Sequence, residues 1–439
     1  MSANPTLAIA NYVCEQRYDD FPQQAIDNAK LAILDTIGVM FAGSRHKVGQ
    51  IISDYARASG AVGPATVIGH GFQTAPELAA MANGIMAHAH DYDDHGHAST
   101  QALPVALALG EARGASGKQA VLSYLVGREV TLNLAKCFDS GGWEGSGPQG
   151  RGWHSVGIAG SMGASATAAK MLELDPQATC TTFGIATSLA GGVFANRGTM
   201  TKPMHAGNAA RNGVLAGTLA GHGFTADPTI FSASGGFSDV FGLPEGSVAS
   251  AAENLRHHFH IVEHGIGVKR YPSCSPTHRY IEAMRMLKAR YQLTPENVGS
   301  IACTPNRSLR CLYPQTDLEC KFSAAFSLVA TLMDGEVNLN NCTESFLRRQ
   351  DVQALLAKTT YIEKVPGSEG FIRVKAVTGQ VYEQPLVRPT DLKVHDEIQQ
   401  KFHLCAIPVA GETKAKEIES LVFGIEELGS ITTLTRLLG

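Results

Sequence analysis

Apolar residues in the first half of the chain recur at the three- and four-residue steps that are typical of amphipathic helices. One such stripe consists of Ile26, Ala29, Ile33, Ile37 and Met40. Gly43 follows this stripe and is expected to close its helix. Further helical patterns, many of them rich in Ala, Gly and Ser, cover residues at about 117–137, 155–173, 177–190 and 205–221. The first half is therefore predicted to be all-helical.

One helix of this half is expected to lead into a run of ionisable residues. Thr74 and Glu77 have the spacing of a capping box, which predicts a helix start. The apolar face continues through Leu78, Ala82, Ile85 and Ala89. The segment at 83–97 then reads NGIMAHAHDYDDHGH, so the ionisable run begins where this helix is predicted to end.

The pattern changes at about residue 298, where VGSIACTPN has the character of a strand. The segment at 370–386 alternates around Thr378-Gly379, as a hairpin does, and helices are expected at about 276–291 and 321–334. A charged helical pattern resumes from about 392. The predicted fold is mainly α with an α+β part. Residues 1–263 and 392–439 form a large all-helical domain, and residues 264–391 form a smaller α+β lid domain inserted before the C-terminal helices.

Composition narrows the class of protein. Of the 439 residues, 17% are charged and 46 are Gly, so charge is sparse on the surface and part of that surface is expected to be the interface of a homodimer. The net charge of −4 and the lack of a Lys/Arg block argue against nucleic acid as a partner. The nine cysteines are scattered without paired spacing, which favours reduced thiols in a cytoplasmic protein. We also expect no signal peptide and no membrane span.

The run at residues 88–97 holds four histidines and three aspartates, a density that suggests a site. Asp91 and His95, and likewise Asp93 and His97, are four residues apart and share a face if the helix persists. The run allows acid/base chemistry, metal binding, or a solvated helix end. Because it lacks H-E-x-x-H and a Cys pair, we expect no metal.

Three further segments offer cations and a histidine. Lys202 and His205 are expected just before a helix, where unpaired backbone N–H groups favour anions. Ser275 and Pro276 are expected to start another helix, with Lys269, Arg270 and His278 around it. His154, after a glycine-rich stretch, is a candidate base or a helix-capping residue. Cys274 is better explained as a structural thiol than as a nucleophile.

These groups together describe a pocket for a small substrate with more than one carboxylate. Removing a proton beside a carboxylate needs a positioned base, an acid, and cations that stabilise the developing negative charge. The histidines and lysines at these positions can supply all three. We expect neither a cofactor nor a metal to take part.

Five segments, in order along nearly the whole chain, resemble the MmgE/PrpD family. They read LAILDTIGVMFAG, NGIMAHAHDYDD, TKPMHAGNAARNG, KRYPSCSPTH and ECKFS. The resemblance implies a helical domain with an α+β lid, a dimer, and cofactor-independent chemistry on small polycarboxylates. Members of the family include 2-methylcitrate dehydratase, cis-aconitate decarboxylase and iminodisuccinate epimerase.

Matching the motifs of the family implies five site residues in this chain, namely Asp91, His154, Lys202, Lys269 and His278. Two positions depart from the pattern. His95 stands where the family typically has threonine, and the following loop is short, leaving His97 to match a later histidine of the decarboxylases. Phe326 stands where the decarboxylases carry a tyrosine, which argues against decarboxylation.

The leading hypothesis is a hydro-lyase, similar to 2-methylcitrate dehydratase. His154 or Asp91 is the expected base and His95 or His97 the expected acid, while Lys202, His205, Lys269 and His278 hold the substrate. The close alternative is an epimerase of an iminodisuccinate-like dicarboxylate, and a decarboxylase of the cis-aconitate type stays open. A metal-dependent hydrolase and a non-catalytic carboxylate-binding protein are the remaining alternatives.

Overall fold

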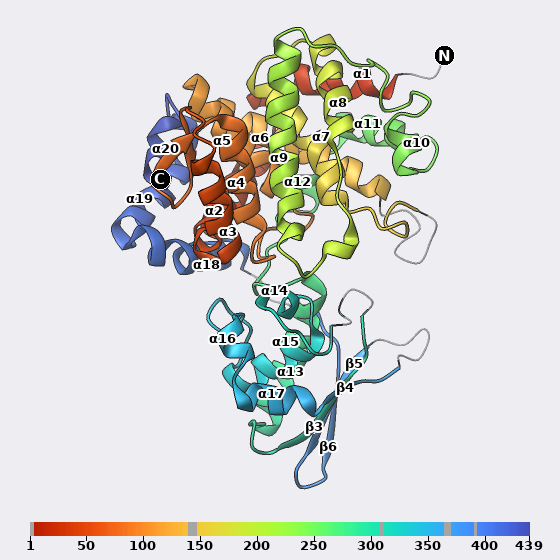
Figure 1. The fold of residues 1–439 in the computed structure, drawn as a ribbon, viewed down its shortest axis with the longest axis vertical. Coiled ribbons are helices and arrows are strands. Elements are labelled where there is room, and N and C mark those ends of the chain that lie inside the picture. Colours follow the sequence, from red (N-terminus) through yellow and green to blue (C-terminus); the bar gives the residue numbers. More distant parts are fainter. Residues whose placement is uncertain (1–3, 139–146, 307–308, 310, 364–369, 390–392) are drawn as a thin grey trace.

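The computed structural model describes residues 4–138, 147–306, 309, 311–363, 370–389 and 393–439. A large body of helices lies beside a smaller body in which helices pack against a sheet (Figure 1). The chain builds most of the large body, passes through the smaller one, and returns with its last helices to the large body. The predicted fold class is confirmed, with a smaller α+β part inserted before the C-terminal helices.

Each body has its own hydrophobic core. One core combines residues between Ile9 and Val268 with residues from Ile398 to Leu438, and we call this part the helical body. The second core runs from Tyr271 to Leu386, and we call it the α+β body. The domain boundaries at 263/264 and 391/392 stay predictions, and the second of them lies outside the described residues.

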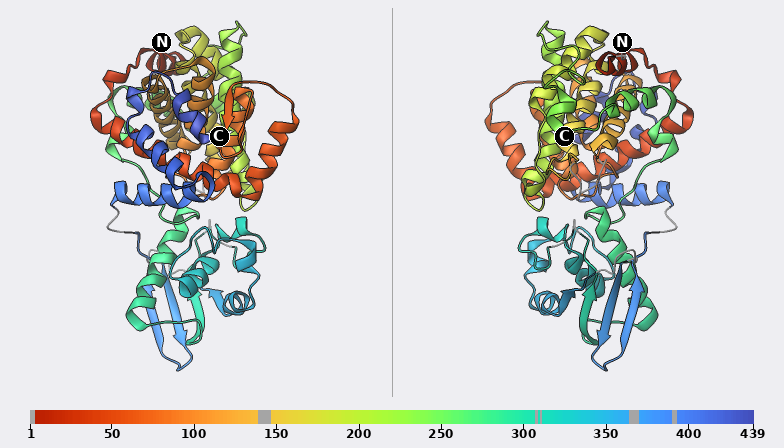
Figure 2. Two further views of the ribbon diagram at one scale, coloured as in Figure 1. Left: turned by 90° about the vertical axis from the view of Figure 1, so that its left-hand side faces the viewer. Right: turned by 90° about the vertical axis from the view of Figure 1, so that its right-hand side faces the viewer.

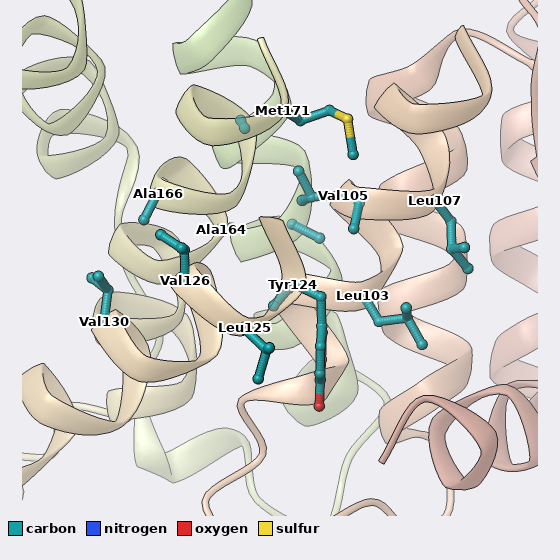
Figure 3. Packing of buried hydrophobic residues seen from close by; sticks show 14 of the residues in the cluster. Leu103, Val105, Leu107, Tyr124, Leu125, Val126, Val130, Ala164, Ala166 and Met171 are labelled. Atoms are coloured by element: carbon teal, nitrogen blue, oxygen red, sulfur yellow. The ribbon is translucent and has the colours of Figure 1, made fainter. Parts of the chain in front are cut away.

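The centre of the helical body is a layer of small-residue helices. These are α4 (Pro76–His88), α5 (Ser99–Arg113), α6 (Gly117–Phe138), α7 (Ser155–Met171) and α9 (Thr201–Gly221). Side chains such as Leu103, Tyr124 and Met171 fill the space where α5, α6 and α7 meet (Figure 3). A Cβ atom on Gly163 would lie 1.7 Å from Thr131 Oγ1, so glycine is what allows α6 and α7 to approach so closely.

The remaining helices of this body surround that layer. They are α1 (Pro5–Glu15), η1 (Tyr18–Asp20), α2 (Gln23–Arg45), α3 (Lys47–Ala58), α8 (Pro176–Leu189), η2 (Phe194–Asn196), α10 (Phe237–Phe241), α11 (Ser247–His257), α12 (His260–Glu263), α18 (Val394–Ala410), α19 (Glu412–Phe423), η4 (Ile425–Glu427) and α20 (Thr432–Leu438). The returning helix α18 packs on α2, where a Cβ atom on Gly38 would lie 3.1 Å from Phe402 Cα. The last helices thereby complete the first core.

Three local expectations are wrong. Helix α2 does not end at Gly43 but continues to Arg45. Gly43 instead allows a close contact between helices, because a Cβ atom added there would lie 2.0 Å from Met86 O. The helical body also contains a small antiparallel pair, β1 (Ala65–Val67) with β2 (Phe72–Thr74), so it is not purely helical. Thr74 therefore ends a strand and bonds Ala61 O, and Pro76 rather than a capping box starts α4.

The sheet of the α+β body has the strand order β4-β3-β5-β6. Strand β3 (Val298–Cys303) is parallel to β4 (Thr359–Tyr361) and antiparallel to β5 (Phe371–Ala376), which pairs with β6 (Val381–Pro385). Helices α13 (Ser275–Tyr291), α14 (Asp317–Cys320), α15 (Ala324–Asp334), α16 (Glu344–Leu347) and α17 (Gln350–Ala357) complete this body. The predicted hairpin at 370–386 is confirmed, and its turn lies at the end far from the helical body (Figure 2).

None of the helices in the described part of the chain combines the length and the apolar character that a bilayer crossing requires.

Candidate active site

Asp91 lies at the centre of the site, three residues past the end of α4. Its backbone adopts a left-handed conformation with φ of 50°, which turns the chain away from the helix axis. One carboxylate oxygen binds Lys202 Nζ and the other binds Lys269 Nζ. Lys269 Nζ also donates to Asp91 O at 2.8 Å. A single buried carboxylate therefore holds a lysine from α9 and a lysine from the segment that leads into the α+β body.

The charges of the neighbouring lysines keep the Asp91 carboxyl ionised. Burial by itself would raise the pKa of the Asp91 carboxyl, but the positive charges of Lys202 and Lys269 outweigh burial and hold that pKa well below its usual range. Burial likewise opposes the charge of Lys269, and the Asp91 carboxylate nevertheless raises the pKa of this ammonium group. The group is thus a carboxylate with ammonium partners, and a carboxylate of low pKa is a weak base.

Asp93 bonds two histidines of the same run. Its Oδ1 lies 2.8 Å from His88 Nδ1 and its Oδ2 lies 2.6 Å from His97 Nδ1. The two imidazole rings meet edge to face, with centroids 4.6 Å apart. The helix ends at His88, so Asp93 and His97 meet through the turn that follows α4 and not on a helical face.

His154 and His205 form a second histidine pair, joining the start of α7 to the second turn of α9. Their Nδ1 atoms lie 2.8 Å apart, so one proton serves both nitrogens. Burial and the charge of Lys202 lower the pKa of His205 to about 4 and that of His154 well below its usual range. His154 occupies the N-cap position of α7, but its side chain makes no cap bond and turns to His205 instead.

Contacts across the boundary of the two bodies complete the site. His95 Nδ1 lies 3.1 Å from Ser275 Oγ, and its backbone N–H donates to Gly267 O at 2.8 Å. His95 therefore contacts the α+β body and not Asp91, because the helix does not persist to residue 95. Burial and Lys269 lower the pKa of His95 to about 4, although part of the side chain still meets solvent. His278 Nε2 lies 3.3 Å from Ser273 O, and burial lowers its pKa to about 3.

Two predicted helix starts are displaced. Helix α9 begins at Thr201, so Lys202 and His205 lie inside its first two turns and not before it. Helix α13 begins at Ser275 with Cys274 at the N-cap position, and Ser275 contacts His95 instead of capping the helix. Burial and the charge of Asp91 raise the pKa of the Cys274 thiol to about 11, in keeping with a structural thiol.

Four residues near the site were not proposed from the sequence. His88 belongs to the run but was not distinguished from the helix that precedes it. Lys321, inside the ECKFS segment, donates to Ala89 O at 3.0 Å and so ties the α+β body to the segment before Asp91. The Phe322 ring lies 5.2 Å from Lys202 Nζ and 5.8 Å from the Arg197 guanidinium carbon. The ECKFS segment, which resembles the family, contains Lys321 and Phe322 and was the feature of the sequence that could have identified them.

Phe326 belongs to the core of the α+β body. Its side chain is fully buried in the second core and meets Phe346 edge to face at 6.1 Å. The expectation that the missing phenolic hydroxyl at Phe326 disfavours decarboxylation stays a prediction.

Among the described residues, one group of His, Cys, Asp and Glu side chains is compact enough for a metal ion. It comprises His88, Asp93 and His97, with candidate donor atoms within 4.8 Å of one another. Two ligands that each bind one ion at about 2.1 Å lie about 3.0–3.4 Å apart in common geometries. The observed 2.6 and 2.8 Å separations are shorter and are those of hydrogen bonds.

Two clefts open beside the site at the boundary of the bodies. One, of about 740 Å³, is lined by residues that include His46, His90 and Asp317. The other, of about 570 Å³, is lined by residues that include Tyr92, Lys269 and Lys401. Lys269 thus borders the second cleft while it binds Asp91.

Comparison with known proteins agrees with the resemblance seen in the motifs. The family model of the MmgE/PrpD N-terminal domain matches residues 7–247, and that of the MmgE/PrpD C-terminal domain matches residues 271–426. Cis-aconitate decarboxylase of Aspergillus terreus is 27% identical, over 99% of this chain and 95% of the relative. Cis-aconitate decarboxylase of Homo sapiens is 28% identical, over 76% and 72% of the two chains. The chain belongs to the MmgE/PrpD family.

Proposed function

We propose that this protein is a lyase that acts next to a carboxylate group of a small di- or tricarboxylate, without a metal or cofactor. The observation that carries the proposal is the buried Asp91 carboxylate with its two lysines, set beside two histidine pairs. Loss of a proton or of carbon dioxide beside a carboxylate places negative charge on that group. Fixed ammonium groups stabilise this charge as it develops.

The two lysines differ in what they still offer a substrate. Lys269 gives two of its three N–H donors to Asp91, through the carboxylate and the backbone oxygen. Among the described residues Lys202 donates to Asp91 alone, so two of its donors stay available for a substrate carboxylate. We assign Lys202 to direct binding of the reacting carboxylate, and Lys269, with Asp91, to holding the ammonium pair in place.

Neutral imidazoles are the bases of the proposed site. Both carboxylate oxygens of Asp91 are occupied by the ammonium groups of Lys202 and Lys269, so we assign the base role to His154 or His97. His154 is held neutral by burial and by Lys202, and a neutral imidazole can accept a proton. His95, His205 and His278 are assigned to hydrogen bonding with the substrate or its leaving group.

Elimination of water from a β-hydroxy polycarboxylate is the first candidate reaction, because the site offers an imidazole base together with further imidazoles for the leaving hydroxyl. Decarboxylation is the second candidate. It is favoured by the relatives, which carry the name cis-aconitate decarboxylase, and the absence of a tyrosine hydroxyl at Phe326 counts against it. Both candidates share the proposed stabilisation of charge by Lys202.

The experiment is a panel of citrate-, aconitate- and succinate-like compounds, each incubated with the enzyme in D2O and followed by proton NMR. Deuterium at a carbon beside a carboxylate demonstrates proton transfer. A new alkene with loss of hydroxyl identifies the hydro-lyase, and released carbon dioxide identifies the decarboxylase. Stereochemical inversion without an alkene identifies the epimerase and contradicts the lyase.

Two controls separate the remaining alternatives. Exhaustive chelation is expected to leave the activity intact, and activity that is lost on chelation and restored by a metal contradicts the metal-free proposal. His154→Ala is expected to abolish turnover while compounds of the panel still bind. A wild-type protein that binds them with neither exchange nor turnover is a carboxylate-binding protein, and the lyase proposal then fails.

A further inference from the structure

Asp93 is completely buried and uses both of its carboxylate oxygens on imidazole rings. An ionised carboxylate can only accept hydrogen bonds, so the Nδ1 atoms of His88 and His97 must both be donors. In a neutral imidazole the second nitrogen, Nε2, is then an unprotonated acceptor. One aspartate thus dictates the tautomer of two histidines.

The Nε2 atom of His88 is an unusual acceptor. It is buried, and it has no hydrogen-bond partner among the described residues. Burial and the charge of Lys202 lower the pKa of His88 to about 4, so the ring is neutral at neutral pH and this nitrogen carries a lone pair. A buried acceptor without a donor costs free energy, and a buried group of this kind in a native structure calls for an explanation such as a role in function.

The charged groups around the two rings belong to the proposed site. Lys202 of α9, Asp91 of the turn after α4 and Lys269 of the segment before α13 act on these rings or on their shared carboxylate. His154, at the start of α7, is also influenced by His88 and His97. The two rings therefore lie inside the network that Asp91 organises, and not in a separate part of the core.

We propose that Asp93 is a positioning residue that fixes His88 and His97 as Nδ1–H tautomers, so that their two Nε2 atoms receive a hydrogen-bond donor of the substrate, such as a hydroxyl group. This inference rests on the proposed function and adds to it a requirement for a donor group. It also gives His88 a role in substrate binding.

The first test measures tautomers and needs no substrate. In protein labelled with 15N histidine, the ring nitrogens are assigned by comparison with His88→Gln and His97→Gln and recorded near neutral pH. Both rings are expected to show a protonated Nδ1 and a bare Nε2. An Nε2–H tautomer at either ring, or metal bound at Nδ1, overturns the inference. The result is independent of turnover, so an inactive substrate panel leaves this test intact.

The second test uses Asp93→Asn, whose amide oxygen can accept a hydrogen bond from one ring while its NH2 group can only donate to the other. One ring must then change tautomer, and kcat is expected to fall on the order of 10²- to 10⁴-fold, as when an aspartate that orients a catalytic histidine is replaced. Asp94→Asn is the matched control, because Asp94 is equally buried but its carboxylate contacts Arg128 and Ser99 and not an imidazole ring. An equal loss of kcat in both folded variants overturns the role of Asp93.

The third test isolates His88. In His88→Asn the side-chain amide nitrogen would take the position of Nδ1. The variant therefore keeps a hydrogen-bond donor to Asp93 and removes the Nε2 acceptor. With a hydroxyl-bearing substrate, kcat/KM is expected to fall about ten-fold or more, the loss expected for one hydrogen bond, while the thermal stability stays close to that of wild type. Unchanged kcat/KM in this variant overturns the role of His88.

Discussion

At the residue scale, the Asp91 carboxylate compensates the charges of two buried ammonium groups, those of Lys202 and Lys269. Asp91→Asn removes the negative charge that holds Lys202 and Lys269 at the boundary of the two bodies. We expect the free energy of unfolding to fall by about 3–5 kcal/mol, because removing one partner leaves uncompensated buried charge. Urea titration followed by circular dichroism measures this loss. Asp27→Asn at an exposed position is the control, and equal stabilities of the two variants would contradict the expectation.

The residue types of the site were predictable from the sequence, but the pairings among them were not. The run at 88–97 pointed to Asp91 and His97, and motif matching pointed to Lys202 and Lys269. The predicted pair of Asp91 with His95 does not form, since the helix ends at His88 and the backbone turns at Asp91. His88 was counted in this run but given no role, because a histidine in the last turn of a helix resembles an ordinary C-terminal charge.

At the scale of elements, contacts between helices depend on glycines that leave no room for a side chain. Gly43→Ala would place a methyl group 2.0 Å from Met86 O, where α2 crosses α4. The helices must then separate, and overpacking of this kind costs about 1–3 kcal/mol. Urea unfolding should show this loss. Gly429→Ala, which meets nothing within 4 Å, is the control and is expected to match wild type.

Periodicity predicted most elements well and their ends less well. The hairpin at 370–386 and the helices at 117–137 and 155–173 are present within a few residues of their predicted bounds. The start of α9 was placed four residues late, which put Lys202 outside the helix. Apolar spacing reports only the apolar part of the buried face of a helix, and the first turn of α9 carries Lys202, a buried polar residue that binds Asp91.

At the scale of the whole molecule, buried neutral histidines make stability depend on pH. Burial lowers the pKa of His88 and His205 to about 4 and that of His278 to about 3, below the value of about 6.5 for an unfolded histidine. Between these values the unfolded chain binds protons that the folded protein does not. The free energy of unfolding is therefore expected to fall as the pH falls from 6.5 toward 4.

Buried carboxyls oppose this trend. Burial raises the pKa of Asp35 to about 6, and it also raises the pKa of Asp94 and of Glu129, so these groups take up protons more readily in the folded protein. We expect the histidines to outweigh these carboxyls because they are more numerous. Urea titrations at pH 7.5, 6 and 5 measure the effect, with the exposed His257→Gln variant as the control. A protein that is equally stable at pH 7.5 and 5 would contradict the expectation.

The low content of charge also predicts an assembly. With 17% charged residues and small residues in abundance, part of the surface is expected to be covered in a homodimer. Sedimentation equilibrium should then give twice the chain mass of 46.5 kDa. A single species at the mass of one chain would contradict the dimer.

The sequence by itself determined the class of most elements, the return of the last helices to the first body, and the kinds of side chain available for chemistry. These properties depend on the local spacing of apolar, turn-forming and ionisable residues. Only the tertiary structure decided that Asp91 meets Lys202, 111 positions away, and Lys269, 178 positions away. Only the tertiary structure joined His88 and His97 through Asp93. Such contacts depend on how whole helices pack and where each one ends, and no local pattern records those distances.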